Sequence, residues 1–153
     1  IMPIWNSTPA TNDNLKSRFT LHEVLTLASI VQKEARHMSE MPIIASVFNN
    51  RLKKMMPLAA DPTVVYALGV ERKNLVTYKD TKTISPYNTY QVSGFPPTPI
   101  ASPSKEAFQA ALTPANTPYF FFVANPDGSH SFTNTYDDHL KIQKVKNRKG
   151  KYL

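Results

Sequence analysis

TLHEVLTLASIVQKEAR, residues 20–36, is the most regular amphipathic stretch of the chain and decides its fold. Thr20 and Glu23, three residues apart, form the pattern of a capping box at a helix start. Apolar side chains then recur at three- and four-residue steps, as on a helix that buries one face. They are Leu21, Val24, Leu25, Leu27, Ala28, Ile30, Val31 and Ala35. We therefore expect a helix here with one face in the core.

Glu34 is the unusual residue of this helix. At about 100° per residue it projects among Leu27, Ile30 and Val31. A carboxyl group on an apolar stripe must pair with a cation, accept hydrogen bonds or stay protonated. The last state is that of a general acid. By periodicity alone, an ion pair with Arg51 on the next helix is favoured over catalysis.

Composition indicates an ordinary globular protein of one domain. The chain has 153 residues, 41% hydrophobic and 19% charged, which suffices for one core. No run of 18 apolar residues exists, so no membrane span is expected, and the absence of cysteine rules out disulfides. The net charge of +7 favours anionic partners, although a solvated basic C-terminal end also explains it.

The order of the predicted elements indicates an α+β fold, helix-dominated, with a small antiparallel β-hairpin. Residues 1–18 look like an extended lead-in or linker from a missing upstream region, anchored by Trp5. Residues 19–147 form the domain, and residues 148–153 a basic tail. Further helices are expected from Ser39 to Met55, from an Asp61 N-cap to Gly69, and over Ser104–Leu112. A last helix, capped by Thr135 or Asn134, is expected to run through Val145. The strands are expected at Tyr119–Ala124 and His130–Thr133.

The proline-rich segment Ile84–Ser104 contains aromatic rings and amides. It is too broken for a long helix and too aromatic for a disordered linker. An ordered loop could present Tyr87, Asn88, Tyr90 and Phe95 on a surface, where rings and amides suit sugars. Alternatively, the rings of this loop belong to the core.

A search for other chemistry leaves Glu34 as the best candidate. The four histidines lack zinc-site spacing, and no cysteine is available, so no metal is expected. No nucleophile elbow, phosphate-binding loop or dinucleotide fingerprint occurs, so no cofactor is expected. The basic tail lacks interleaved aromatic residues and nucleic-acid-binding motifs.

A series of short motifs resembles the catalytic domain of one family, the endolytic murein transglycosylases (MltG, YceG-like). The motifs follow the family's order from about Leu21 to His139. They are residues 27–34 (LASIVQKE), 47–52 (VFNNRL), 61–64 (DPTV), 85–90 (SPYNTY), 94–97 (GFPP) and 122–124 (FVA), followed by His130 and Phe132.

The resemblance implies cleavage of the β-1,4 bond after N-acetylmuramic acid in peptidoglycan without water, giving 1,6-anhydro ends. The family's catalytic glutamate falls on Glu34, so a helix-borne acid would act as in lysozyme-like folds. The preceding acidic position of the motif is Gln32 here. Within the motifs, we expect substrate contacts from Asn50, Arg51, Asp61, Tyr87, Asn88 and Tyr90.

Two departures from the family pattern bear on substrate fit. Ala59 stands where a glutamine is common, and residues 102–104 (SPS) replace Asn-Pro-Gly. They motivate an alternative, a non-catalytic glycan-binding or scaffolding module of the cell-wall synthesis machinery. A nucleic-acid binder rests on charge alone.

The resemblance also implies a cellular location and partners for the protein. Family members carry an N-terminal membrane helix and an upstream region that this chain lacks. We therefore expect action at the extracytoplasmic face of the bacterial cell membrane, with anchoring by an absent upstream segment. The expected partners are peptidoglycan glycan strands and cell-wall synthesis proteins, and no nucleic acid.

Overall fold

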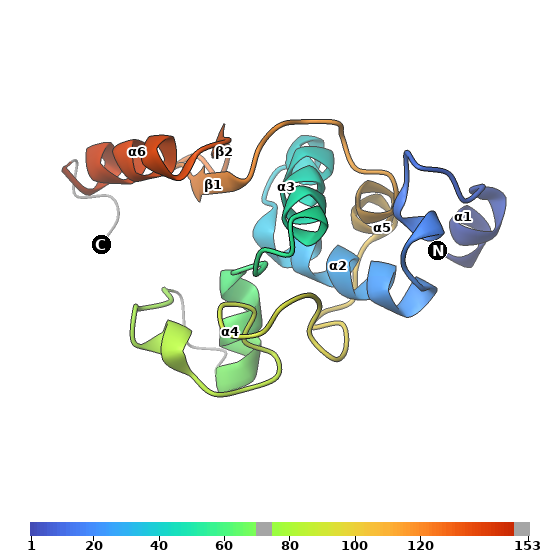
Figure 1. Ribbon diagram of the computed structural model, residues 1–153, viewed down its shortest axis with the longest axis horizontal. Coiled ribbons are helices and arrows are strands. Elements are labelled where there is room, and N and C mark those ends of the chain that lie inside the picture. Colours follow the sequence, from blue (N-terminus) through green and yellow to red (C-terminus); the bar gives the residue numbers. More distant parts are fainter. Residues whose placement is uncertain (70–74, 149–153) are drawn as a thin grey trace.

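The computed structural model describes residues 1–69 and 75–148, which form helices and one two-stranded antiparallel sheet (Figure 1). The helix-dominated α+β prediction is confirmed. The helices are α1 (Met2–Ser7), α2 (Leu21–Glu34), α3 (Met41–Lys53), α4 (Asp61–Leu68), α5 (Lys105–Leu112) and α6 (Tyr136–Arg148). The strands are β1 (Phe121–Ala124) and β2 (His130–Thr133), and short 3₁₀ turns occupy Leu15–Ser17, Met38–Glu40 and Asp80–Lys82.

Helix α2 lies at the centre of the core, as its sequence predicts. Its capping box is formed, with the Thr20 side chain accepting from the Glu23 N–H and the Glu23 side chain accepting from the Thr20 N–H. The stripe of Val24, Leu27 and Ile30 is fully buried. The helix packs against α5, α3 and α4 (Figure 1). Burial of this stripe is therefore the main local contribution to the core.

The start of α4 differs from the sequence prediction. The helix ends as expected at Gly69, which adopts φ +66°. Ala60, not Asp61, occupies the N-cap position, and no side chain caps the helix. The predicted capping role of Asp61 is therefore wrong, and its carboxylate is available for other contacts.

The extended conformation predicted for residues 1–18 is wrong, although Trp5 anchors the segment as expected. Helix α1 and a 3₁₀ turn fold onto the domain, because Leu15 lies in the core and Trp5 packs against it. The Lys16 ammonium donates to the carbonyls of Trp5 at 2.6 Å and Thr8 at 2.8 Å, which fixes the end of α1. Of the predicted tail, only Arg148 is described, as the last residue of α6.

The hairpin and α6 project from the helical core, on the same side as α4 and its following loop (Figure 1). Phe121 pairs with Thr133, and Ala124 pairs with His130. Phe122 packs its ring against Phe48 at 5.8 Å. Because neighbouring residues of a strand point to opposite faces, Phe121 is directed away from that contact.

Helix α6 begins where the sequence predicts a helix start, directly after Thr135. The Thr135 hydroxyl accepts from the Asp138 N–H at 3.2 Å, as a capping side chain does. None of the helices in residues 1–69 and 75–148 has the length and apolar character needed to cross a membrane.

Candidate active site

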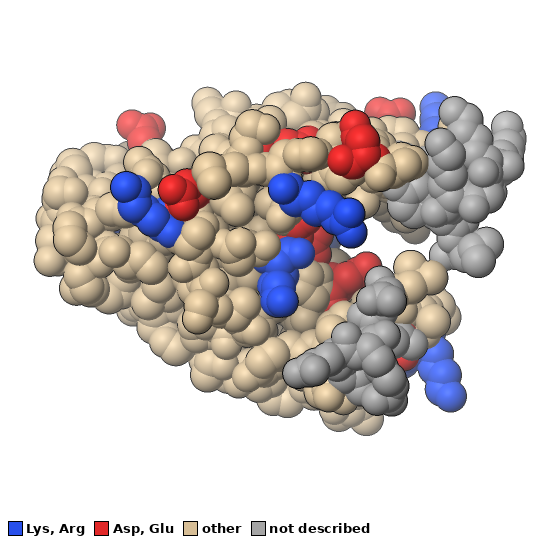
Figure 2. All heavy atoms as spheres, turned by 180° about the vertical axis from the view of Figure 1, so that it is seen from behind, with Lys and Arg blue, Asp and Glu red and all other residues tan. Residues whose placement is uncertain are grey.

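A cleft of about 820 Å³ separates the hairpin and α6 from α4 and the loop that follows it. Its base is formed by the ends of α2 and α3. Figure 2 shows the hollow, with acidic side chains on its wall and basic side chains beside it. Its volume lies in the range of ligand-binding pockets. The lining includes Glu34, Phe48, Arg51, Leu58, Ala59, Asp61, Thr77, Tyr78, Thr81, Tyr90, Phe121, Phe122, His130, Tyr136, His139 and Gln143.

Glu34 is the last residue of α2 and lies partly buried at the cleft. Its carboxyl group forms no ion pair with any residue in the described ranges. Burial, and secondarily the negative charge of Asp61, raise the pKa of Glu34 to about 8. The negative end of the α2 dipole also disfavours a charge there. Glu34 therefore carries its proton at neutral pH, as a proton donor must.

Arg51 does not pair with Glu34, so the ion pair favoured by periodicity is wrong. Its Nε donates to the Phe120 carbonyl at 2.7 Å, and its Nη1 donates to the Pro57 carbonyl at 2.9 Å. The guanidinium also lies 5.0 Å from the centre of the Phe121 ring. Arg51 thus joins the hairpin side of the cleft to the segment that leads into α4.

Asp61 and Tyr90 form a second polar group in the cleft. The Tyr90 hydroxyl donates to Asp61 Oδ1 at 2.5 Å. Desolvation raises the pKa of Asp61, and the bond from Tyr90 opposes this rise because it stabilises the carboxylate. Burial and the neighbouring Asp61 raise the pKa of Tyr90, so the phenol keeps its proton and remains a donor.

Four of the seven site residues predicted from sequence come together: Glu34, Arg51, Asp61 and Tyr90 line the cleft. The other three do not line it. The Asn50 amide donates to the carbonyls of Thr117 at 2.9 Å and Tyr119 at 2.7 Å. It therefore holds the connection to the hairpin in place of the predicted substrate contact.

Asn88 is completely buried, which corrects its predicted role at the surface. Its amide donates to the carbonyls of Thr81 at 3.1 Å and Thr83 at 2.8 Å. Its Oδ1 accepts from the Tyr90 N–H at 3.0 Å. Asn88 therefore closes the loop and places Tyr90 at the cleft.

Tyr87 also lies outside the cleft lining, contrary to its predicted contact. Its hydroxyl pairs with that of Thr98 at 2.8 Å, and its ring lies 4.7 Å from that of Tyr66. Phe95 packs edge-on against Phe19 at 5.0 Å. Phe95 thus follows the alternative interpretation, that the rings belong to the core, whereas Tyr87 packs on Tyr66 at the surface.

Gln32 and Ala59, which depart from the family pattern, can be located in the structure. Gln32 Oε1 accepts from the Ser104 N–H at 2.8 Å, which ties α2 to the N-cap of α5. Ala59 lines the cleft with φ +49°, an uncommon value for a residue with a Cβ.

Sequence reasoning missed the rings that the hairpin and α6 bring to the cleft. Phe121, Tyr136 and His139 line it together. The available signals were the alternation of residues 121 and 122 across a strand and the three-residue spacing of 136 and 139 on a helix.

In the part of the chain that the structure describes, no group of three or more His, Asp and Glu residues could hold a metal ion.

A helix-dominated α+β domain with one protonated carboxyl group in an open cleft defines a class of protein suited to general-acid chemistry. The sequence profile of the YceG-like family matches residues 4–145. The chain belongs to the YceG-like family.

Similar proteins agree with this assignment. A Bacillus subtilis (strain 168) protein named endolytic murein transglycosylase is 45% identical over 128 residues, which cover 84% of this chain and 35% of that protein. A protein of the same name from Streptococcus pneumoniae serotype 2 is 35% identical over 131 residues, covering 82% of this chain and 24% of that one. The chain therefore spans only a minor part of these relatives.

A crystal structure of a yceG-like protein from Listeria monocytogenes has the same fold. The TM-score is 0.78 at 45% sequence identity, over 83% of this chain and 41% of that one.

Replacement of Arg51 tests its role as a link between the two sides of the cleft. Arg51→Ala leaves carbonyls on both sides without their donor, so we expect the free energy of unfolding to fall by about 2–3 kcal/mol. Arg51→Lys should recover only part of the lost free energy of unfolding, because an ammonium group lacks the forked donors of a guanidinium. Urea denaturation measures both. Lys53→Ala, an exposed change on the same helix, is the control, and equal stability of Arg51→Ala and Lys53→Ala contradicts the link.

The raised pKa of Glu34 makes stability depend on pH. From the ordinary value of 4.5 up to about 8, the folded protein binds a proton that the unfolded chain has released. Rising pH therefore lowers the stability of the wild type across this window. Glu34→Gln removes the dependence, so its stability relative to the wild type should increase from pH 5 to pH 8 in urea titrations. A constant difference would show that the Glu34 pKa is not raised.

Proposed function

We propose that this domain is an endolytic lytic transglycosylase of peptidoglycan, with Glu34 as its single acid and base. The observation that carries this proposal is the position of the Glu34 carboxyl group, which forms no ion pair in an open cleft where burial raises its pKa to about 8. The names of the Bacillus and Streptococcus relatives support the substrate class. Because the chain spans a minor part of those proteins, the activity is assigned to this domain as a proposal.

In the first step, Glu34 donates its proton to the bridging oxygen of the N-acetylmuramic acid–β-1,4–N-acetylglucosamine bond. The bond between that oxygen and C1 breaks, and the N-acetylglucosamine end leaves with a hydroxyl. Positive charge develops on the muramic acid ring, and Asp61, whose Oδ1 accepts from Tyr90, lies in the same cleft to stabilise that charge.

In the second step, the Glu34 carboxylate removes the proton of the muramic acid C6 hydroxyl. The C6 oxygen bonds to C1 and closes the 1,6-anhydro ring, so Glu34 regains its proton and no water is consumed. A carboxyl group with a pKa near 8 suits both steps, because it is protonated at the start and strongly basic after donation.

The proposal includes a location and partners. Peptidoglycan strands lie outside the cytoplasm, so the domain acts on the extracytoplasmic side of the cell membrane, held there by a segment outside this chain. The neighbouring proteins are those of cell-wall synthesis. The basic surface suits the acidic stem peptides and polymers of the wall.

End-group analysis of digested glycan strands tests the reaction. The wild type should produce 1,6-anhydro-muramic acid ends detected by mass spectrometry, and Glu34→Gln should lower the rate about 100-fold or more. The control is Glu23→Gln, which replaces another acid of α2 that lies outside the cleft lining. It should fold and cleave strands like the wild type at the same enzyme concentration. Reducing ends from the wild type, or full activity of Glu34→Gln, would rule the proposal out. Strand binding without new ends favours the non-catalytic glycan-binding module.

The pH profile tests the electrostatic role of Asp61. Its charge favours the protonated form of Glu34, so Asp61→Asn should lower the Glu34 pKa. The basic limb of kcat/KM, expected near pH 8 in the wild type, should then move to lower pH. Tyr90→Phe removes the donor that stabilises the Asp61 charge, and its limb should move in the same direction by less. An unmoved limb in Asp61→Asn would show that the two carboxyl groups are not coupled.

A further inference from the structure

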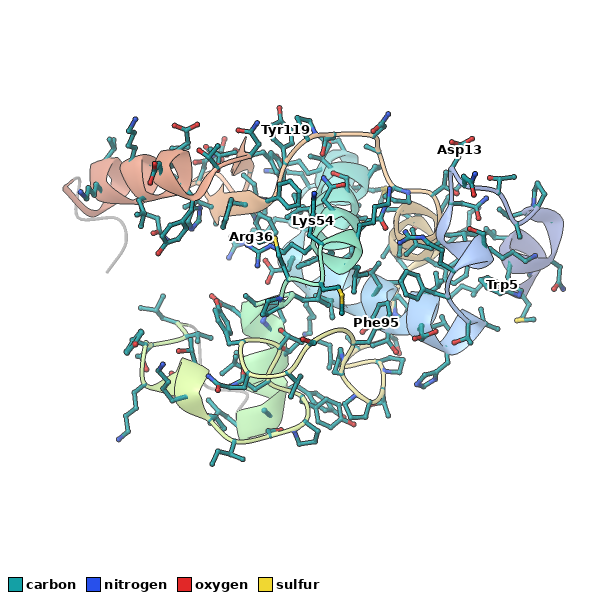
Figure 3. The ribbon with its side chains drawn as sticks, in the orientation of Figure 1. Trp5, Asp13, Arg36, Lys54, Phe95 and Tyr119 are labelled. Atoms are coloured by element: carbon teal, nitrogen blue, oxygen red, sulfur yellow. The ribbon has the colours of Figure 1, made fainter. Side chains whose placement is uncertain are left out.

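Three rings from β1 and α6 form a continuous group on the hairpin side of the cleft. Figure 3 shows these two elements with their side chains. Phe121 lies 5.1 Å from the His139 ring at 28° and 5.8 Å from the Tyr136 ring. Tyr136 and His139 lie 6.2 Å apart at 29°. All three line the cleft that contains Glu34. We call these three residues the aromatic wall.

The aromatic wall is not explained by packing of the core. Tyr136 is 59% exposed although it is a large ring. Its neighbour in the cluster, Phe121, lies on the strand face opposite to Phe122, which packs on Phe48. An exposed ring, supported by two half-buried rings at the wall of a cleft, indicates a ligand-binding surface.

The face of α6 continues the wall with a polar group. Tyr136, His139 and Gln143 are spaced by three and four residues, so they share one helix face, and all three line the cleft. Burial, and secondarily Arg51, lower the pKa of His139, so its ring is neutral. Its Nδ1 has no hydrogen-bond partner among the described residues. The face thus combines flat apolar rings with neutral polar groups.

We propose that the aromatic wall, together with Gln143, is a subsite for a pyranose ring of the glycan strand, next to the sugar that Glu34 acts on. The ligand class rests on the proposed function, whereas the subsite rests on the geometry of the rings. The C–H face of a pyranose stacks on the exposed Tyr136 ring, and the Gln143 amide can bond its hydroxyl groups.

The chemistry of the opposite side favours a sugar over an apolar helix or peptide. The loop after α4 presents the hydroxyl-bearing residues Thr77, Tyr78 and Thr81 across the cleft. Thr77 Oγ1 already accepts from the Asp80 N–H, and Thr81 Oγ1 already donates to the Tyr78 carbonyl. Because a hydroxyl both donates and accepts, each keeps bonding capacity that a sugar hydroxyl can use and an apolar helix cannot. The cleft also continues to Glu34, so a strand bound there passes both the acid and the wall.

Binding to the inactive protein tests the subsite without turnover. In Glu34→Gln, the affinity for peptide-free glycan strands is measured by isothermal titration calorimetry. Adding Tyr136→Ala should weaken it about three- to tenfold, the effect of one stacked ring. Tyr136→Phe should bind within twofold of the parent, because the ring remains. Exposure of Tyr136 makes unfolding by the substitution improbable, and circular dichroism checks it.

A matched control and a kinetic readout separate stacking from a structural effect. Tyr66 is also a partly exposed tyrosine, 45% exposed on α4 and outside the cleft lining, so Tyr66→Ala should leave strand affinity unchanged. With active enzyme, Tyr136→Ala should raise KM three- to tenfold with little change in kcat, as for a contact made equally before and during reaction.

The outcomes distinguish the subsite from the proposed reaction. Unchanged affinity and KM in Tyr136→Ala overturn the subsite, even if the wild type forms anhydro ends. Weaker binding in Tyr136→Ala supports it, even if no anhydro ends are formed and the reaction is wrong. If only peptide-bearing strands bind, and free stem peptide competes for the Tyr136-dependent binding, the wall recognises peptide and the proposal is overturned.

Discussion

The bonds from the Arg51 guanidinium to backbone carbonyls hold the two sides of the cleft in one arrangement. On one side, the guanidinium donates to the carbonyl of Phe120, directly before β1. On the other side, it donates to the carbonyl of Pro57, three residues before Ala60, the N-cap of α4. A charged donor in partly buried surroundings makes strong bonds to such carbonyls. The cleft therefore depends on a residue whose charge is used for structure.

This use of Arg51 has a chemical consequence for Glu34. An arginine directed at Glu34 would hold it ionised and remove its capacity as an acid. Because the Arg51 guanidinium donates to carbonyls, it does not pair with Glu34. Burial, and secondarily the charge of Asp61, therefore raise the pKa of Glu34. Tyr90 in turn donates to Asp61 and opposes the rise in the Asp61 pKa that burial causes. The surroundings of each carboxyl group thus set its pKa, as for paired acids in other enzymes.

The parts that sequence could predict are those set by local patterns. The period of α2 and its capping box place Glu34 on a buried face without knowledge of the rest of the chain. Asp61 was misassigned because its position depends on a distant contact: Thr89 accepts from the Ala60 N–H at 2.9 Å, which fixes Ala60 as the N-cap. Asn88 and Tyr87 were misassigned because composition cannot distinguish a loop that binds a ligand from one that bonds to itself.

The hairpin shows how a projecting element can still be placed accurately. Glu40, before α3, accepts at 3.0 Å from both the backbone N–H and the Nδ1 of His130. Arg51, on α3, binds the start of β1. Both anchors come from the segment that follows Glu34 in the chain, so the acid and the aromatic wall share a common frame. Groups supported in this way from rigid elements keep the spacing that a bound strand requires.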